Sequence, residues 1–530
     1  MTVLAEPKGM AESEANPYDV VPYESHAFDF TDPQRLHAIG RLFGMTPPDF
    51  RKARVLELGC AGGGNILPMA FRYPDAEFVG VDLSAVQIGQ ARELAEEVGA
   101  KNIVFRQMSI TDITPEFGAF DYIICHGVFS WVPAPVRDAI LSISKQNLTP
   151  NGIALISYNT LPGWYQVRAV REMMLYHCAR FPTLKEKIEQ GIALLRFVLE
   201  SANAGLVAYR ESLQNELNLL TSQRAYYIFH EHLENENHAL HLHEMAAQAR
   251  AEGLEYLGDV NLETMFTHNF SPLVVEKLAA VDDIVRIEQY LDFITNRRFR
   301  ISLFGHRGVT IRRNLDSAQI LDFHIGSRVL PPADSVDLSR DVRTVFKMQN
   351  GAELTAENRY AAAYMSVLAS LGNRIARARD IVSEATSKVS ATPDAEARIR
   401  AAFVEFGLRL AFCGGLVLHS AAPSYTGAVS RRPVGFAPAR AVSRRNDIVP
   451  SVFHARLTLG SAERVLIQAC DGTRDRGALV DVIAESVARG ELSVQRSGQP
   501  ISDPAQARTE IESWVGGMLA RFAELGLLTA

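Results

Sequence analysis

The chain has 530 residues, of which 47% are hydrophobic and 22% are charged, and its formal net charge is −7 at pH 7. These values are typical of a globular protein and leave room for about three domains. The acidic balance argues against a general nucleic-acid binder, and no stretch reaches the about 18 uncharged apolar residues that a membrane span needs.

The N-terminus and the cysteines indicate the compartment. Glu6, Glu12 and Glu14 interrupt the first residues, which contain no apolar core, so we expect neither a secretory signal nor membrane insertion. The five cysteines form no pair with metal or redox spacing, and their odd number fits a reducing compartment. We therefore expect a cytoplasmic protein.

An aromatic segment precedes the first predicted strand. Residues 1–16 are rich in Glu, Ala and Pro and predict a flexible tail, whereas residues 17–30 contain several aromatic side chains. Thr31 or Asp32 is expected to cap a helix over residues 34–44. Three aromatic side chains are candidates for a lid over a ligand cleft, or alternatively for a cover over the sheet edge: Tyr18, Tyr23 and Phe28.

Residues 54–84 combine two predicted strands with a glycine-rich turn. The apolar run from Val55 to Leu58 predicts a buried parallel strand, a helix is expected over residues 65–72, and a second strand ends at Asp82. Glycines let the backbone approach a ligand closely, and the helix that follows presents unpaired N–H groups. An acid that closes the second strand can accept two ribose hydroxyls. The unit therefore predicts a nucleoside-binding site.

Glu57 favours S-adenosylmethionine over NAD as the nucleoside. A carboxylate two residues before Gly59 would repel a pyrophosphate at the helix N-terminus, but it suits a ligand that carries an ammonium and a sulfonium. The spacing of Gly59, Ala61 and Gly63 also lacks the three-glycine pattern of dinucleotide sites. Gly64 falls where the third glycine of that pattern would stand, so NAD is disfavoured and not excluded.

Further strands are expected over residues 102–106, 120–125 and 153–158, with a helix over residues 85–98. Asp112 follows the third strand and is a candidate to accept the adenine amine; the alternative is a helix cap or a turn. The loops after the fourth and fifth strands leave the reactive edge of an open parallel sheet. The candidate cofactor-binding residues are Tyr23, Glu57, Gly59, Cys60, Ala61, Gly63, Asp82, Leu83, Ser109, Ile110, Asp112 and His126.

These two loops also supply the catalytic candidates. His126 is a candidate general base, because its ordinary pKa lies near neutrality; the alternative is a hydrogen bond to the loop backbone. Trp131 is expected to be half core and half site wall, and Tyr158 to orient the acceptor or to pack in the core. The histidine-rich run from residue 230 to residue 243 contains no complete ligand set, so we expect no metal.

The rest of the chain is organised around an insertion. Residues 166–238 are helical and too long for an ordinary connection, and strands resume near residues 254–260 and 301–304. Three helical blocks after residue 461 are typical of a winged-helix unit. The expected organisation is a tail over 1–16, an α/β core over 17–165 and 238–310, a helical insert over 166–237, a helical middle domain over 311–430, and a linker with a winged-helix-like domain over 431–530.

Several stretches resemble one family, the bacterial methyltransferases that carry a methyltransferase regulatory domain, which include rickettsial protein lysine methyltransferases acting on outer membrane proteins. They include VLELGCAGGGNILPMA, FVGVDLSAVQI, FDYIICHGVFSWVP and SYNTLPGW. The resemblance implies a Rossmann-like, seven-stranded class I methyltransferase domain that uses S-adenosylmethionine. It also implies a protein substrate, methylated on lysine, and a helical dimerisation or regulatory region.

Residue by residue, the family pattern matches the cofactor loop at Glu57, Gly59 and Gly63, the ribose acid at Asp82 and the adenine contact at Asp112. Ala61 departs from the commoner glycine, and no catalytic residue is fixed by the motif. Two alternatives stay open: methylation of a small molecule or another protein nucleophile, and a regulatory protein that binds the cofactor and engages a partner. Residues 476–490 carry mixed charges, which favours contact with protein over contact with DNA.

Overall fold

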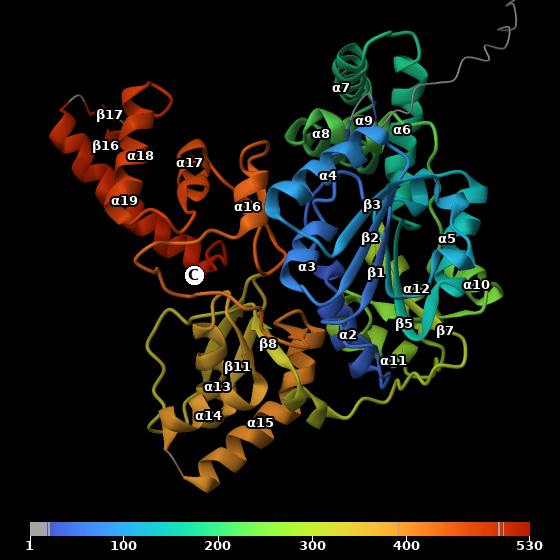
Figure 1. Ribbon diagram of the computed structural model, residues 1–530. Coiled ribbons are helices and arrows are strands. Elements are labelled where there is room, and N and C mark those ends of the chain that lie inside the picture. The colour runs from blue at the N-terminus through green and yellow to red at the C-terminus, as the bar shows by residue number, and fades with distance from the viewer. Residues whose placement is uncertain (1–18, 20–21, 391, 497–498, 502, 530) are drawn as a thin grey trace, which may run out of the picture.

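The structure is a computed structural model that describes residue 19 and residues 22–390, 392–496, 499–501 and 503–529. The expected tail over residues 1–16 and the lid candidate Tyr18 lie outside the described residues. Figure 1 shows an α/β core, a group of helices beside it that includes α6–α9, a middle region around α13–α15, and a C-terminal group of helices. None of the helices in the described ranges is long and apolar enough to cross a bilayer.

A seven-stranded sheet forms the centre of the core, in the order β3-β2-β1-β4-β5-β7-β6. The strand β7 runs antiparallel to both of its neighbours, and the other strands are parallel. The order reverses between β1 and β4, which opens a crevice at the carboxyl ends of these two strands. The bounds are β1 (Arg54–Leu58), β2 (Glu77–Asp82), β3 (Ile103–Gln107), β4 (Phe120–Cys125), β5 (Leu148–Asn159), β6 (Leu254–Asp259) and β7 (Phe299–His306).

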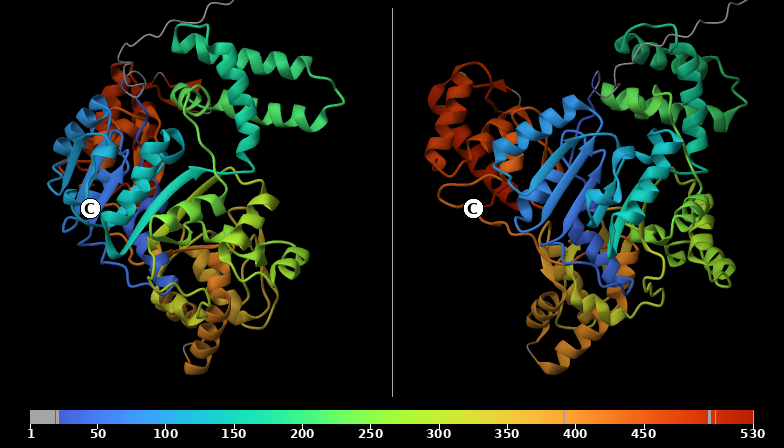
Figure 2. Two further views of the ribbon diagram at one scale, coloured as in Figure 1. Left: turned by 90° about the vertical axis from the view of Figure 1, so that its right-hand side faces the viewer. Right: turned by 45° about the vertical axis from the view of Figure 1, so that its right-hand side comes forward.

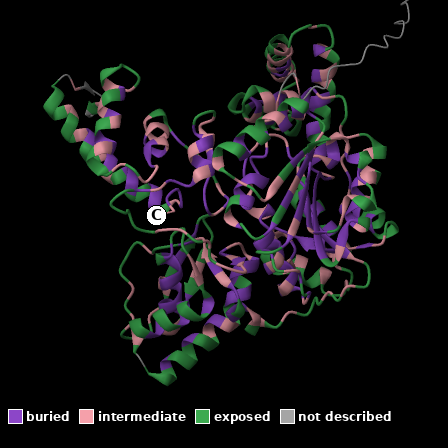
Figure 3. Ribbon diagram, viewed as in Figure 1, coloured by how far each residue is buried: buried purple, intermediate pink, exposed green. Residues whose placement is uncertain are grey.

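Helices cover both faces of this sheet because successive side chains of a buried strand point to opposite sides. Val55, Ile124 and Leu155 pack on the face covered by α2 (Pro33–Leu42), α3 (Ile66–Arg72) and α4 (Ala85–Val98). Leu56 and Ile156 pack on the other face, below α5 (Ala134–Gln146) and α10 (Leu242–Ala251). Figure 3 shows the sheet as the most continuously buried part of the molecule. The strand predictions are correct, with ends that differ by a few residues.

The helical insert stands between β5 and β6, as expected. It comprises α6 (Trp164–Cys178), α7 (Leu184–Ser201), α8 (Val207–Ser222) and α9 (Ala225–His232). These helices share a small apolar core of their own, to which Met174, Leu195 and Leu220 belong. Figure 2 shows α7 and α8 extending away from the sheet. In the histidine-rich run, His232 Nε2 lies 2.9 Å from Glu216 Oε1, inside this subdomain.

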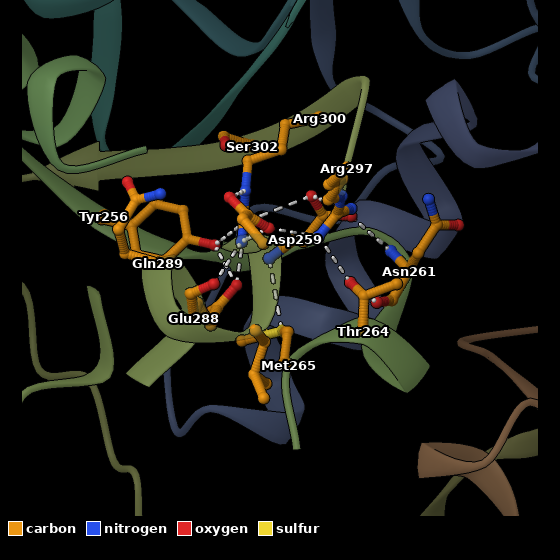
Figure 4. A network of polar contacts seen from close by, with 12 residues as sticks. Tyr256, Asp259, Asn261, Thr264, Met265, Glu288, Gln289, Arg297, Arg300 and Ser302 are labelled. Atoms are coloured by element: carbon orange, nitrogen blue, oxygen red, sulfur yellow. Dashed lines mark hydrogen bonds and ion pairs between the residues drawn. The ribbon is translucent and has the colours of Figure 1, made fainter. Parts of the chain in front are cut away.

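The basic run ahead of and within β7 is held by buried carboxylates. Arg300 is fully buried, and its Nε lies 2.7 Å from Asp292 Oδ2 on α12 (Ile284–Thr295), while its Nη1 lies 2.9 Å from Glu288 Oε2. Arg297 Nη2 lies 2.9 Å from Asp259 Oδ2 at the end of β6. Figure 4 shows these groups converging. Arg297 and Arg300 are therefore carboxylate partners in this structure.

The middle region is less purely helical than expected. Its helices are α13 (Arg359–Ser370), α14 (Ala378–Val389) and α15 (Pro393–Phe412), and α14 has no counterpart in the sequence prediction. One small sheet joins β8 (His324–Ser327) to β12 (Ile375–Arg377) and β13 (Leu416–His419), and another joins β9 (Val329–Leu330) to β10 (Thr344–Met348) and β11 (Glu353–Ala356). Two short strands that follow each other closely in the chain, β8 and β9, thus belong to different sheets.

The C-terminal region begins with a segment that was expected to be a linker or an extended arm. Part of it is the helix α16 (Ala437–Val442), which packs against α3 and α4 of the core. Arg444 and Arg445 each place a guanidinium nitrogen 2.6 Å from the Glu97 carboxylate on α4. A short hairpin of β14 (Ile448–Pro450) and β15 (Arg456–Thr458) follows, and then α17 (Ser461–Ala469), α18 (Arg476–Ala488) and α19 (Pro504–Glu524).

Candidate functional site

The glycine-rich turn after β1 adopts left-handed backbone conformations. Gly59 has a φ of +73°, Ala61 of +46° and Gly63 of +76°. A Cβ on Gly59 would lie 2.4 Å from Val128 Cγ2, so a larger residue does not fit there. Ala61 tolerates its uncommon φ while its N–H donates to Asp82 Oδ2 at 2.9 Å. The thiol of Cys60 is buried, so this residue offers mainly its backbone to the turn.

Asp82 closes β2 beside the turn, as the sequence predicts. Its second oxygen, Oδ1, accepts the Ser84 N–H at 2.9 Å, so backbone donors fix both ends of the carboxylate. Burial raises the pKa of this carboxyl, and the two backbone N–H groups oppose the rise. Leu83, the next residue, is 58% exposed and faces outward from the edge of the sheet.

Glu57 is the most unusual acid of the site. It is buried, its Oε1 accepts the Asn65 side-chain N–H at 2.6 Å, and its Oε2 has no hydrogen-bond partner among the described residues. Burial, together with nearby Asp82, raises the pKa of this carboxyl to about 8. A buried acceptor without a donor is costly, so the site fits a ligand that brings a cationic N–H group to this oxygen. S-adenosylmethionine carries such a group.

The carboxyl end of β3 lies next to Asp82, because Asp82 pairs with Gln107 in the sheet. Ser109 caps a short 3₁₀ turn over Ile110–Asp112, accepting the Thr111 N–H at 3.2 Å. Ile110 is buried and Asp112 is exposed. The three candidate residues therefore follow the strand end that pairs with Asp82, and of these three only Ser109 and Asp112 carry polar side chains.

The N-terminal segment lies over the glycine-rich turn. The Gly64 N–H donates to Ser25 Oγ at 2.7 Å, and the Phe28 N–H donates to Asn65 Oδ1 at 3.0 Å. Tyr23 continues this segment toward the helical insert, where its ring meets Tyr226 of α9 edge-on at 5.1 Å. The segment that carries Phe28 thus lies against the turn, and Tyr23 lies at the boundary with the insert.

His126 follows β4 and is enclosed by aromatic rings. The ring centroids of Phe28, Phe30 and Phe299 lie 4.3, 4.9 and 6.1 Å from that of His126. His126 Nδ1 lies 2.9 Å from Ser157 Oγ on β5. Burial, assisted by the nearby Arg456 charge, lowers the pKa of His126 to about 3. So low a pKa makes the imidazole a weak base at neutral pH, and the hydrogen bond that it makes is to the Ser157 hydroxyl rather than to the loop backbone.

The structure places Tyr158 away from His126. Neighbouring residues of a strand point to opposite faces, so Ser157 meets His126 while Tyr158 enters the opposite core. Tyr158 is 1% exposed, and its hydroxyl lies 3.0 Å from Ser302 Oγ. An acceptor at the His126 side of the sheet does not reach this hydroxyl. This burial favours the packing alternative for Tyr158 over the alternative in which its hydroxyl orients the acceptor.

Trp131 lies at the junction with the insert. Its ring meets that of Trp164 edge-on at 6.1 Å, and the guanidinium of Arg171 on α6 lies 5.2 Å from its centroid. Trp164 in turn donates its indole N–H to Asn237 at 2.7 Å. These contacts make Trp131 part of the joint that carries the insert.

Several residues that the sequence does not single out lie around the glycine-rich turn and His126: Ser25, Asn65, Ser157, Phe299, His454 and Arg456. Asn65 stands one residue after the glycine-rich turn, which is the one local signal among them. The others come from distant segments.

A cleft of about 750 Å³ adjoins the start of β7 and separates the core from the middle region; it is lined by Glu263, Asp292, Asn296, Arg297, Arg298, Glu353 and neighbouring residues.

Comparison with known proteins places this geometry in a family. Residues 49–232 match a methyltransferase domain, residues 224–306 a predicted methyltransferase regulatory domain, and residues 431–527 the PKMT C-terminal winged helix domain. The uncharacterized protein RP789 of Rickettsia prowazekii is 40% identical over 522 residues, which cover 97% of this chain and 94% of that protein. The uncharacterized protein RP028 of the same organism is 39% identical over 240 residues, 45% of this chain and 96% of that protein.

A solved structure extends the likeness to nearly the whole fold. PKMT2 from Rickettsia typhi, in complex with AdoHcy, is 30% identical, with a TM-score of 0.87 over 96% of this chain and all of that chain. The shared elements include the Rossmann-like seven-stranded sheet and the winged-helix end. The chain belongs to the S-adenosylmethionine-dependent methyltransferases that combine a class I catalytic domain with a methyltransferase regulatory domain and a PKMT winged helix domain.

Proposed function

We propose that the chain transfers methyl groups from S-adenosylmethionine to the side-chain amine of a lysine in a protein substrate. The observation that carries this proposal is the aromatic enclosure around His126, where Phe28, Phe30 and Phe299 meet at the reactive edge of the sheet. Aromatic faces attract cationic methyl groups, and an apolar surrounding lowers the pKa of an amine. Both the substrate and its methylated product suit such a wall.

The proposed contacts to the methyl donor follow the order of the strands. Glu57 Oε2 accepts from the α-ammonium, Asp82 accepts the ribose hydroxyls, and Asp112 accepts the adenine amine. The remaining proposed contacts are Tyr23, Gly59, Cys60, Ala61, Gly63, Leu83, Ser109, Ile110 and His126. S-adenosylmethionine supplies an electrophilic methyl group when it is bound. These residues align it with the incoming amine, and alignment accounts for much of the acceleration of an in-line transfer.

A lysine amine attacks only in its neutral form, although its reference pKa is about 10.4. The guanidinium of Arg456 lies 4.8 Å from the ring centroid of Phe28, so a fixed positive charge adjoins the aromatic enclosure. A like charge and an apolar wall both lower the pKa of an ammonium that enters. In this proposal the surroundings, rather than a dedicated base, release the proton to water before transfer.

A protein substrate is supported by the cleft beside β7 and by the relatives. The cleft of about 750 Å³ adjoins the start of β7 and lies between the core and the middle region, and its lining combines the carboxylates of Glu263 and Glu353 with the guanidinium groups of Arg297 and Arg298. A groove of this size with both charges offers polar contacts to a peptide. The solved relative is named PKMT2, and the sequence resembles methyltransferases that act on outer membrane proteins. We propose an outer-membrane or surface protein precursor as the substrate class.

We also propose that the chain forms a homodimer through the helical insert. Large apolar side chains are exposed on the insert, among them Tyr176 at 89%, Phe197 at 65% and Val207 at 59%. Apolar side chains gathered on one subdomain commonly mark a protein interface.

Labelled methyl transfer into a bacterial lysate tests the proposed activity. We expect wild-type protein to place label from methyl-labelled S-adenosylmethionine in a protein fraction, and hydrolysis to release it as methylated lysine. Asp82→Ala is the matched control, since loss of the ribose contact is expected to weaken donor binding by about 1–3 kcal/mol. Label in small molecules or in another residue type would support the runner-up activities. Donor binding without any transfer would leave a regulatory binding protein.

A further inference from the structure

The hairpin of β14 and β15 inserts a histidine from the C-terminal region into the methyltransferase core. His454 is fully buried, and its φ of +60° is uncommon for a residue other than glycine. The loop is tied around it: the His454 N–H donates to Ser451 O at 3.0 Å, and the Ser451 N–H donates to Ala455 O at 2.9 Å. The chain therefore accepts an unfavourable backbone conformation in order to hold this ring inside the core.

The imidazole meets the side chain that supports Glu57. His454 Nε2 lies 2.9 Å from Asn65 Oδ1, and because an amide oxygen only accepts, this nitrogen carries the proton. The Phe28 N–H donates to the same oxygen at 3.0 Å. The Thr31 hydroxyl also lies 2.9 Å from this oxygen and 2.7 Å from the Phe28 carbonyl oxygen, so three donor groups surround the amide oxygen. The amide orientation is fixed, and its NH₂ group is directed at Glu57 Oε1, 2.6 Å away.

The consequence for Glu57 is an asymmetric carboxylate. One oxygen is held by Asn65, and the other is buried without a partner among the described residues. We propose that His454, supplied by the C-terminal region, is a positioning residue that holds Asn65 so that Glu57 presents its free oxygen to the ammonium of the methyl donor. This inference rests on the proposed contact between Glu57 and that ammonium.

The groups around His454 keep it a neutral donor. Asp32 and Arg72 adjoin it, but they pair with each other at 2.6 Å, and Asp32 also accepts the Tyr73 hydroxyl at 2.7 Å. Burial lowers the pKa of His454 to about 4, with opposing contributions from Asp32 and Arg72. At neutral pH the ring therefore contributes a hydrogen bond and no charge.

A set of substitutions separates positioning from simple packing between regions. His454→Leu removes the N–H, and His454→Gln restores one at a comparable distance from the backbone with the same left-handed strain. His419→Leu is the control: its Nδ1 lies 3.2 Å from Gln34 Nε2, so it joins two regions of the protein without touching Asn65. Thermal unfolding of each full-length variant confirms that it is folded before binding is measured.

Calorimetry measures the affinity of each variant for two ligands, S-adenosylmethionine and 5′-methylthioadenosine. The second ligand lacks the amino-acid moiety of the first and therefore has no ammonium group. We expect His454→Leu to weaken S-adenosylmethionine roughly tenfold and to leave 5′-methylthioadenosine unchanged, with His454→Gln recovering most of the loss. His419→Leu should change neither affinity. Equal weakening of both ligands, or no weakening of either, would overturn the proposal.

Glu57→Gln distinguishes a failure of this inference from a failure of the proposed Glu57 contact. In that background His454→Leu should have no further effect on S-adenosylmethionine, because the two residues act on one interaction. If Glu57→Gln alone leaves S-adenosylmethionine binding unchanged, the ammonium contact itself is wrong. If Glu57→Gln weakens S-adenosylmethionine binding and His454→Leu weakens it further in the same protein, the Glu57 contact is supported and the positioning role of His454 is wrong. Neither measurement depends on the identity of the methyl acceptor.

Discussion

Glu57 combines two properties that seldom occur in one carboxyl: a hydrogen bond of 2.6 Å to one oxygen and burial without a partner at the other. Its ordinary pKa of 4.5 rises to about 8, chiefly because burial disfavours the charge. The unliganded protein therefore holds this group mostly protonated at neutral pH. An ammonium placed at the free oxygen favours the carboxylate and returns the pKa toward its ordinary value.

Donor binding should consequently depend on pH. Between about pH 6 and pH 8 the complex binds fewer protons than the free protein, so the association constant for S-adenosylmethionine should rise with pH, by up to about tenfold per unit, until the α-ammonium of the ligand begins to lose its proton near pH 8. Calorimetry in two buffers of different ionisation enthalpy measures the released proton directly. Glu57→Gln should bind more weakly and show a flat profile. A flat profile in the wild type would show that Glu57 does not change its protonation on binding.

Whether such residues can be predicted from the sequence depends on how far along the chain their partners lie. Glu57, the turn and Asp82 stand within 30 residues and follow from strand, glycine and acid spacing. His454 and Phe299 reach the site from hundreds of residues away, and only the folded backbone brings them there. Tyr158 shows why a local signal can also mislead. Neighbouring residues of a strand point to opposite faces of the sheet, and the position of a strand end does not say which of the two faces an acceptor would approach.

At the scale of elements, the N-terminal segment over residues 22–32 and the glycine-rich turn fit without spare room. A Cβ on Gly64 would lie 2.2 Å from the backbone oxygen of Ser25. The same backbone carries the Phe28 N–H that helps to fix Asn65. The segment therefore depends on the absence of a side chain at one position of the turn.

Gly64→Ala should displace this segment while leaving the sheet intact. Because the obstacle is backbone rather than a flexible side chain, we expect a loss of about 1–3 kcal/mol in unfolding free energy, weaker S-adenosylmethionine binding, and faster proteolysis within residues 22–32. Gly62→Ala is the control, since its Cβ would meet no atom closer than 3.6 Å. Chemical denaturation and limited proteolysis measure the effects. If the two variants behave alike, the close approach at Gly64 is unimportant.

Long periodic elements are predictable from the sequence, and short ones are not. The helix α4 has the predicted bounds, 85–98, because its apolar spacing, its N-cap and the glycine that follows it agree over more than ten residues. The strands β8 and β12 span four and three residues and pair across about 50 positions of the chain, so no local alternation marks them. The helix α16 has six residues inside a Pro- and Arg-rich stretch, and its packing on α3 and α4 stabilises it.

At the scale of the whole molecule, the exposed apolar side chains of the insert call for a partner surface. They lie on α6, α7 and α8, which extend from the core and have their own small interior. A second copy of the chain offers the same surface in a two-fold arrangement.

Light scattering coupled to size-exclusion chromatography should give the mass of a dimer for the wild type. The double substitution Tyr176→Glu and Phe197→Glu should give the mass of a monomer, because two buried carboxylates oppose association. Tyr290→Glu is the control, since Tyr290 is a 41% exposed aromatic on α12, outside the insert. A wild type that elutes as a monomer at micromolar concentration, or a double variant that stays dimeric, would place the interface elsewhere.

The contact between His454 and Asn65 also orders events during synthesis. A ribosome makes Asn65 early and His454 almost 400 residues later, so the emerging polypeptide can assemble its sheet while the nucleoside pocket still lacks one wall. In our proposal for His454, full methyl-donor affinity is therefore reached only near the end of translation. Nascent or prematurely terminated chains that stop before β14 carry the glycine-rich turn and both acids, yet they are poorly equipped to compete with finished enzyme for the cofactor.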